Sequence, residues 1–280
     1  MYGYFLILLS ALFHSFWNVL LKDSENKYFF NFLMHLTNLV IFSIMYLLFF
    51  KDFLYFDKNI FIYSFIAATF FSGYHICLST AYRYGEISSY YPIVSSSPVF
   101  VLIWAIVFLK EKLTISGSIA IFLIIAGVFF VGLVKYSKAE SIKGVYFSLL
   151  AALFYSFGAI IDKIGVSRKN FILYIYLLTL FMTIYMYIFN YKFIGRGYSF
   201  YLKNYFWKIL LGGFILFSSV FSYRYGLTMV NVSYAVFIRQ ANILFGLLFG
   251  YLIFREKIHR YKVVGAILIA VGVVIIKLNT

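Results

Sequence analysis

The stretch Ala11-Leu12-Phe13-His14-Ser15-Phe16 decides how this chain folds, because it returns as Ala152-Leu153-Phe154-Tyr155-Ser156-Phe157. Further matches follow in the same order at nearly constant spacing: Lys22 with Lys163, Tyr82-Arg83-Tyr84-Gly85 with Tyr223-Arg224-Tyr225-Gly226, Lys110-Glu111-Lys112 with Arg255-Glu256-Lys257, and Ala126-Gly127-Val128 with Val271-Gly272-Val273. Chance supplies one short match but not several in order. The chain is therefore a duplication, and we place the two copies at residues 1–138 and 139–280.

The composition places both copies in a membrane. Of the 280 residues, 64% are hydrophobic and only 12% are charged, whereas soluble domains carry roughly 25% charged residues. A bilayer core needs about 20 apolar residues of helix, and strands of a membrane barrel would be shorter and strictly alternating. Breaking the sequence at its charged clusters gives ten apolar runs: Tyr2–Leu21, Tyr28–Phe50, Ile60–Tyr82, Ser88–Leu109, Ile115–Val134, Gly144–Ile161, Phe171–Tyr191, Tyr205–Tyr223, Val230–Phe254 and Val263–Ile276. The sequence predicts an all-α, polytopic membrane protein with ten transmembrane helices.

Each copy holds five runs, an odd number, so the second copy enters the membrane from the opposite side. Inverted repeats of this kind give many secondary transporters two alternating access states. A duplicated bundle with a purely structural role is the alternative, and the pattern favours transport.

The charged residues and the single cysteine exclude several classes of protein. The net charge is +15, but Lys and Arg sit in short clusters between apolar runs, which is typical of loops near anionic headgroups, and we expect no binding of nucleic acid. Cys77 alone allows no disulfide and no cysteine-based metal site. Because the chain also shows no acidic pair, no His/Asp/Glu cluster and no phosphate-cradling loop, we expect no enzymatic activity, no cofactor and no metal. The first run lacks the features of a cleaved signal peptide, so we expect a multi-pass protein of the cell (inner or plasma) membrane.

The strongest anomaly is Arg239-Gln240-Ala241-Asn242, well inside the ninth run. A cation at the middle of the hydrocarbon costs at least about 2.5–3.5 kcal/mol, so it normally faces a cavity or a partner. All nine acidic residues lie at or near the ends of the runs. We hypothesise that Arg239 receives a carboxylate or phosphate of the substrate; the alternative is that it binds backbone carbonyls or extends toward the interface.

The matching stretch of the fourth run is Ser95-Ser96-Ser97-Pro98. Pro98 has no N–H and frees a carbonyl one turn back, which is tolerated only where protein, water or a ligand takes it up. Serines also allow close helix packing. Together with the Arg239 stretch, they predict a pseudo-symmetric polar pair near the midplane.

On the first run, His14 and Asn18 lie one turn apart, and Ala11, Ser15 and Lys22 complete a polar-to-small helical face. Histidine titrates near neutral pH, so His14 is a candidate proton carrier, with His35 and His75 as weaker ones. A histidine that simply bonds to a neighbouring helix is the alternative.

Aromatic and hydroxyl side chains complete the candidate substrate pathway. Aromatic rings can hold a cation through cation–π contacts, which would matter if the substrate were cationic. The further candidates are Trp17, Tyr74, His75, Tyr82, Tyr155 (at the position of His14 in the second copy), Ser218 and Ser219.

Two other repeated features are predicted to be structural. Glycines inside the runs have the spacing of close helix contacts, and the basic-Glu-basic turns around Glu111 and Glu256 are expected to anchor helix ends. The glycines are Gly127, Gly132, Gly246, Gly250, Gly265 and Gly272.

These features together resemble the EamA family of the drug/metabolite transporter superfamily, over essentially the whole chain. The resemblance rests on a basic-Glu-basic turn and a Gly-rich fifth helix, both present twice, on a Pro-containing fourth helix in the first copy, and on His14, Trp17, Asn18 and Lys22 of the first run. It implies ten helices around a central cavity, lined by the third, fourth, eighth and ninth helices with help from the first and sixth. It also implies substrates such as amino acids, other small metabolites or drugs, often moved outward. The resemblance implies internal termini, whereas the Lys and Arg count favours external ones, so the orientation stays open.

We therefore expect a secondary transporter, an exporter of a small polar metabolite such as an amino acid or organic anion, with its site between the fourth and ninth helices. The alternatives are a non-transporting membrane subunit and a membrane-embedded lipid-modifying enzyme.

Overall fold

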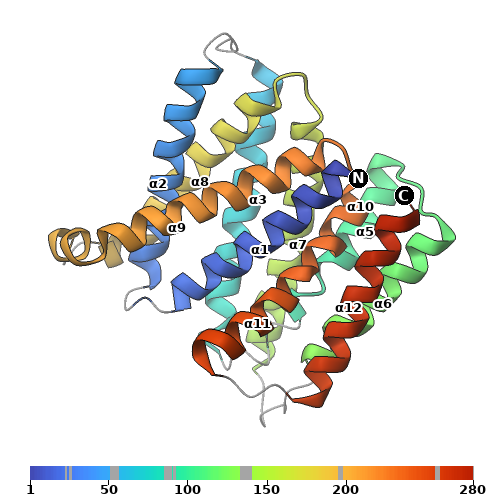
Figure 1. Ribbon diagram of the computed structural model, residues 1–280. Coiled ribbons are helices and arrows are strands. Elements are labelled where there is room, and N and C mark those ends of the chain that lie inside the picture. The colour runs from blue at the N-terminus through green and yellow to red at the C-terminus, as the bar shows by residue number, and fades with distance from the viewer. Residues whose placement is uncertain are drawn as a thin grey trace.

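The computed structural model describes residues 1–22, 24, 27–50, 57–84, 90, 93–132, 141–194, 198–255 and 259–279. These residues are helical almost throughout and include no strand. The helices are α1 (Tyr2–Lys22), α2 (Lys27–Phe49), α3 (Lys58–Ala81), α5 (Ser97–Leu109), α6 (Ile115–Gly132), α7 (Ile142–Val166), α8 (Phe171–Ile194), α9 (Tyr198–Leu227), α10 (Val232–Ile238), the 3₁₀ helix η2 (Arg239–Ala241), α11 (Asn242–Phe254) and α12 (Arg260–Asn279) (Figure 1).

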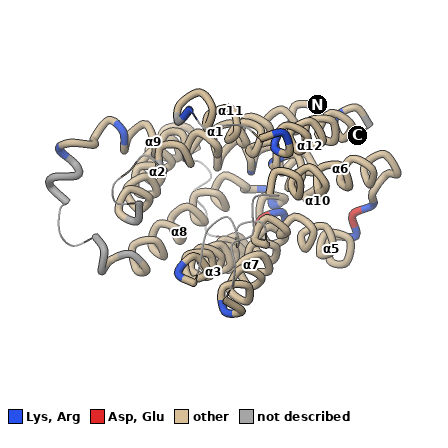
Figure 2. The backbone as a smooth tube through the Cα atoms, turned by 90° about the horizontal axis from the view of Figure 1, so that it is seen from below, with Lys and Arg blue, Asp and Glu red and all other residues tan. Residues whose placement is uncertain are grey.

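Within the described residues, nine helical segments are long and apolar enough to cross a membrane, and α5 is a shorter apolar one. Large apolar side chains face outward along them, for example Leu48 of α2, Phe122 of α6 and Leu252 of α11, each more than 60% exposed. A soluble protein rarely exposes so much apolar surface. Lys and Arg lie mostly where helices end (Figure 2). The all-α, multi-pass fold class is confirmed.

The fourth and ninth spans are broken, both at the polar stretches that the sequence singled out. In the fourth, residues 95–96 form a turn and α5 begins only at Ser97, with Pro98 in its first turn, where a missing N–H costs nothing. In the ninth, α10 ends at Ile238, the three residues of η2 follow, and α11 continues from Asn242. The fourth span is therefore interrupted at the stretch that contains Pro98, whereas the ninth keeps one helical span, Val232–Ile253, with a 3₁₀ turn inside it. Apolarity sets the length of a span but not the path of its backbone.

The helices form two bundles that mix the two copies. In the first bundle, α1 packs along α9 and α11; in the second, α7 packs along α3 and α5. The pairs α2–α8 and α6–α12 join matching helices of the two copies (Figure 1). Exchanging the copies therefore exchanges the bundles. The duplicated architecture is confirmed, while the proposed boundary between residues 138 and 139 falls outside the described residues.

The basic-Glu-basic turns begin alike in both copies. Lys110 caps α5 and Arg255 caps α11, and both adopt left-handed backbone angles, with φ of 57° and 54°. Such angles are uncommon for residues other than glycine, so their recurrence at matched positions reflects the shared origin of the turns.

Close backbone contact holds α6 against α12. A Cβ atom on Gly127 would lie 2.7 Å from the carbonyl oxygen of Gly265, and one on Gly272 would lie 2.7 Å from the carbonyl oxygen of Ala120. Small residues allow this approach in membranes, where dispersion contacts rather than water exclusion hold helices together. The prediction of close packing is confirmed for these three glycines. Gly246, in contrast, has room for a Cβ atom 3.4 Å from Ser15 Oγ.

Substitution of Gly265 by Ala should therefore destabilise the fold. Its Cβ atom would lie 2.5 Å from the Gly127 carbonyl oxygen, and overpacking typically costs about 1–3 kcal/mol. We expect a lower midpoint of thermal unfolding for the purified Gly265→Ala protein in detergent. The Gly246→Ala variant, on the uncrowded glycine, is the control, and equal midpoints for the two variants would contradict the packing described here.

Candidate functional site

Arg239 lies where the ninth span changes from α10 to η2, and its side chain contacts α9 and α1 of the first bundle. Its guanidinium carbon lies 4.3 Å from the centroid of the Tyr223 ring on α9, within the range of a cation–π contact. One of its terminal nitrogens lies 3.5 Å from Nδ1 of His14 on α1, a long and weak contact. In the described part of the chain, no carboxylate pairs with this guanidinium.

Three buried polar atoms around Arg239 have no hydrogen-bond partner in the described part of the chain. They are the indole N–H of Trp17, the hydroxyl of Tyr223 and the amide oxygen of Asn242. The Trp17 ring packs against His14, with centroids 5.2 Å apart. Buried polar groups are nearly always paired, so this neighbourhood offers two donors and one acceptor to a ligand.

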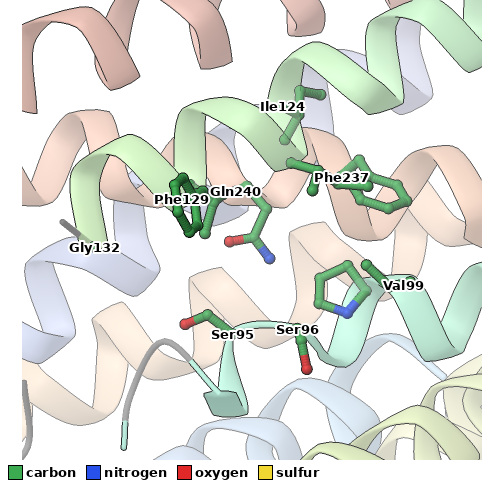
Figure 3. A pocket seen from close by; sticks show the side chains of 11 residues that line it. Ser95, Ser96, Val99, Ile124, Phe129, Gly132, Phe237 and Gln240 are labelled. Atoms are coloured by element: carbon green, nitrogen blue, oxygen red, sulfur yellow. The ribbon is translucent and has the colours of Figure 1, made fainter. Parts of the chain in front are cut away.

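Gln240 points to the other side of η2, away from Arg239. With Ser95 and Ser96 it lines a pocket of about 170 Å³ between α5, α6 and η2 (Figure 3). The other walls are apolar, including Phe129 and Phe237. Ser96 Oγ donates to the carbonyl of Ile93 at 2.6 Å. The polar stretches of the fourth and ninth spans thus share one pocket, in which Gln240 lies with Ser95 and Ser96. Arg239 faces α1 and α9 instead.

The aromatic candidates of the second bundle gather on α3 and α7. The Tyr155 ring lies 5.5 Å from that of Tyr74 and 5.8 Å from that of Phe71, and Tyr74 lies 4.9 Å from His75. His75 is close enough to His14 for an electrostatic interaction, and Tyr155 is close enough to Tyr223. These residues therefore face the Arg239 neighbourhood across the interface between the bundles.

The remaining candidates lie elsewhere. Asn18 is exposed, Ser97 is buried at the start of α5, and Tyr82 caps the end of α3. Ser219 bonds to α1, because its hydroxyl donates to the Ser10 carbonyl at 3.1 Å and Ser10 Oγ donates back to the Ser219 carbonyl at 2.8 Å. Ser218 Oγ donates to the Phe214 carbonyl of its own helix at 2.9 Å. The side chain of Lys22 and the residue Glu256 lie outside the described residues.

Sequence reasoning missed a charged cluster at the end of α7. The sixth run was ended at Ile161, but α7 continues to Val166, so Asp162 lies inside the helix and is 1% exposed. Its Oδ1 accepts from Arg224 Nε and from the Tyr174 hydroxyl, both at 2.9 Å. Asp162 lies about one turn before the end of α7, as predicted for the acids, but it is buried and paired inside the helix. The sequence shows that Asp162 and Arg224 are charged, but it does not show that they pair across two helices.

Two neighbouring links tie helix ends together. Lys163 Nζ donates to the carbonyls of Leu227 and Val230 at 2.7 and 2.8 Å, at the C-terminal end of α9, where the helix dipole favours a cation. The Glu111 carboxylate accepts from the backbone N–H groups of Val232 and Ser233 at 2.9 and 3.0 Å, at the start of α10. Glu111 is therefore a helix anchor, as predicted.

Two inverted five-helix copies around a cation with no carboxylate partner among the described residues define the class of this protein: a polytopic membrane transporter. The chain belongs to the EamA-like transporter family, whose family model matches residues 1–133 and 142–278. No curated protein matches the chain. A solved structure described as "Crystal structure of protein" is 12% identical, covers 99% of this chain and 95% of its own, and superposes with a TM-score of 0.78. At this identity the likeness shows the fold alone.

The serine pair on α9 gives a prediction. Ser219→Ala removes an interhelical bond and should lower stability by about 0.5–1.5 kcal/mol, with no change in substrate affinity. The neighbouring Ser218→Ala removes only a bond within the helix and should leave stability nearly unchanged. Thermal unfolding and a transport KM for both variants test this, and a raised KM with unchanged stability for Ser219→Ala would place Ser219 in the substrate pathway instead.

Proposed function

We propose that this protein is a secondary transporter that exports a small organic anion or an amino acid across the cell membrane. Alternating access would come from rocking of the two bundles, and Arg239 would hold the anionic group of the substrate between them. Membership of the EamA-like transporter family supports the coarse assignment. The substrate class rests on the residues around Arg239, and outward movement on the resemblance described above.

The proposal rests on the observation that Arg239 has no carboxylate partner among the described residues. A guanidinium in the membrane without a carboxylate partner is costly, and here it has only a ring face and a weak imidazole contact among the described residues. A carboxylate or phosphate would match its planar fork of donors. The free donors of Trp17 and Tyr223 would add to the same anion, and the amide oxygen of Asn242 would accept from an ammonium or hydroxyl group of the substrate.

Alternating access follows from the exchange of bundles by the two-fold relation. The bundle of α1, α9 and α11 and the bundle of α3, α5 and α7 have equivalent internal packing. If one bundle tilts against the other, an equivalent packing exists in which each copy takes the position that the other copy had before. Arg239 and Tyr223 belong to one bundle, and Tyr155, Tyr74 and His75 face them from the other, so a substrate between them would be exposed first to one side and then to the other.

Arg239→Gln tests the substrate class. In proteoliposomes offered labelled amino acids, organic phosphates and organic cations, we expect transport of an anionic or zwitterionic substrate, reduced about 10- to 100-fold in kcat/KM by the substitution, since a hydrogen bond to a charged group is worth about 1.5–3 kcal/mol. Arg239→Lys should recover part of the loss, because the charge remains but the fork is gone.

The control for this experiment is Arg83→Gln, on an exposed arginine just beyond α3. It should leave transport unchanged. Equal activity of the Arg239→Gln protein and the parent would remove Arg239 from the mechanism. Transport of cations alone would contradict the substrate class.

Proton coupling is the second part of the proposal. His14 lies against Arg239 and Trp17, with His75 nearby on α3, so a change in its charge would be felt directly by a bound anion. We expect His14→Gln to abolish accumulation driven by a pH gradient while substrate exchange at equal pH continues. Accumulation at the parental rate in the variant would exclude His14 as the proton carrier.

The same liposomes test the two alternatives. A non-transporting subunit would move none of the labelled compounds, and a lipid-modifying enzyme would change the chemical composition of the vesicle lipids instead.

A further inference from the structure

The charged cluster at the end of α7 links the two bundles at one end of the molecule. Asp162 and Lys163 belong to α7, in the second bundle, whereas Arg224 and the carbonyls of Leu227 and Val230 belong to α9 and its C-terminal end, in the first. This is the end at which the chain starts, because Gly3 of α1 packs against the end of α9.

A third link, at the same end, joins α5 to the ninth span, whose helix α11 belongs to the first bundle. Glu111 follows α5, in the second bundle, and its carboxylate accepts from two backbone N–H groups and the Ser233 hydroxyl at the start of α10. The Ser233 hydroxyl bond is 2.6 Å long, as expected for a charge-assisted bond. Three links therefore lie at one end of the molecule: the Asp162–Arg224 pair, the bonds of Lys163 and the bonds of Glu111.

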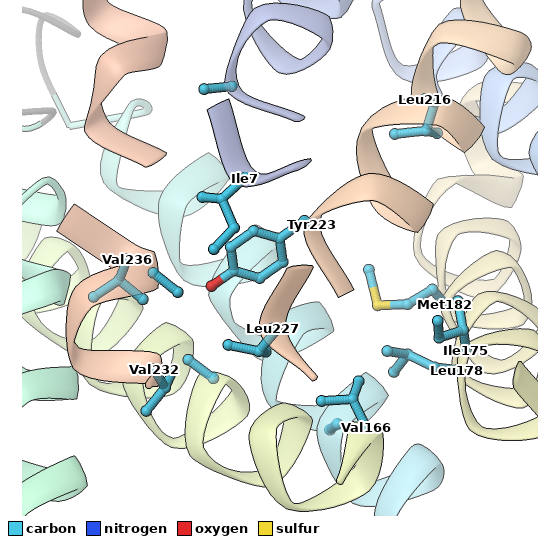
Figure 4. Close-up of a cluster of buried hydrophobic side chains, with 14 of the residues drawn as sticks. Ile7, Val166, Ile175, Leu178, Met182, Leu216, Tyr223, Leu227, Val232 and Val236 are labelled. Atoms are coloured by element: carbon cyan, nitrogen blue, oxygen red, sulfur yellow. The ribbon is translucent and has the colours of Figure 1, made fainter. Parts of the chain in front are cut away.

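Apolar packing surrounds these bridges. Val166 and Leu227 are 2% and 0% exposed, and Val232 is completely buried; all three belong to the same buried apolar cluster as Tyr223 (Figure 4). Charged bonds shielded from solvent in this way are screened little by salt, and breaking one leaves an uncompensated buried charge. The end of the molecule that carries the bridges is therefore closed.

The first copy lacks the acid that this closure needs. At the constant offset that matches Lys22 with Lys163 and Arg83 with Arg224, the residue matching Asp162 is Leu21. Arg83 is exposed, whereas Arg224 is drawn into the protein by Asp162.

The helix contacts show the same asymmetry. The helices α7 and α9 touch across the bundle interface, while α1 and α3, which match them, are not among the packed helix pairs of the described residues. The two ends of the molecule therefore differ although the copies are related.

The geometry points to a one-sided latch: Asp162–Arg224, Lys163 and Glu111 hold the bundles together at the end that carries the N-terminus, and the conformation described here is the one open toward the opposite end. The latch rests on the proposed alternating access. Because the first copy has Leu21 where the second has Asp162, the Asp162–Arg224 pair has no counterpart at the opposite end. The two access states are therefore unequal in energy, and the bridges at this end must break before it can open.

Cysteine labelling measures the latch without any substrate. In a Cys77→Ser background, one reporter is Val166→Cys, inside the closed end. The other is Ser79→Cys, one helical turn beyond His75 and on the same face of α3; His75 interacts electrostatically with His14 of α1. With a hydrophilic maleimide and the full-length protein in detergent, we expect slow labelling of the first reporter and fast labelling of the second.

Arg224→Gln should then reverse the pattern. Labelling should accelerate about tenfold or more at Val166→Cys and slow down at Ser79→Cys, because loss of a buried ion pair amounts to several kcal/mol. The matched variant Arg83→Gln should change neither rate. Unchanged rates in Arg224→Gln, or an equal effect of Arg83→Gln, would overturn the latch.

Faster labelling at both reporters would mean that Arg224→Gln unfolds the protein. The decision then passes to Glu111→Gln, which removes a charge but keeps an amide oxygen that can accept from the N–H groups of Val232 and Ser233. A reciprocal change at the two reporters in Glu111→Gln supports the latch, and rates equal to the parent overturn it. Labelling needs no substrate, so it can be compared with transport by the same protein. If the labelling rates change reciprocally but none of the offered compounds is transported, the proposed function is refuted and the latch is supported.

Discussion

The structure depends on the cost of placing polar groups in hydrocarbon, where each must find a partner within the protein. This chain meets the cost in two different ways. Asp162 and Arg224 satisfy one another, with Tyr174 as a further donor. Arg239 lies at a helix break with unpartnered donors near it. The first arrangement stabilises a packed interface, and the second leaves binding capacity unused in the middle of the molecule.

Helix breaks at matched positions connect the two copies to this site. Residues 95–96 interrupt the fourth span and η2 interrupts the ninth. A 3₁₀ turn rotates successive residues by about 120°, so Arg239 and Gln240 leave the same turn in different directions. One faces α1 and α9, and the other faces the pocket beside α5 and α6. A short irregular segment thus serves two separate surfaces.

Much of the fold could be predicted because hydrophobic length and internal repetition are visible in the sequence. The spans, the duplication, the glycine contacts of α6 with α12 and the anchoring role of Glu111 followed from such patterns. The sequence also singles out Arg239, since an intramembrane cation needs an explanation; its role in transport stays a prediction. The direction of the Arg239 side chain could not be predicted, because the sequence pattern indicates a continuous helix with the Arg239 stretch facing the fourth span.

The misses share a physical reason: pairing across helices is invisible in a linear pattern. Asp162 looked like a residue beyond the end of a span until Arg224, sixty-two positions later in the chain, was seen beside it. Ser219 looked like a polar residue available to substrate, but its hydroxyl is used by Ser10. Sequence periodicity shows that a group is polar and inside the membrane, while only the packed structure shows whether another group already satisfies it.

The most direct test of the central claim is an experimental structure with a transported substrate bound. The account predicts that the anionic group of the substrate lies within hydrogen-bonding distance of the Arg239 guanidinium, with the Trp17 indole N–H or the Tyr223 hydroxyl as a second donor. Substrate found elsewhere, with Arg239 bonded to backbone carbonyls of its own bundle, would contradict it.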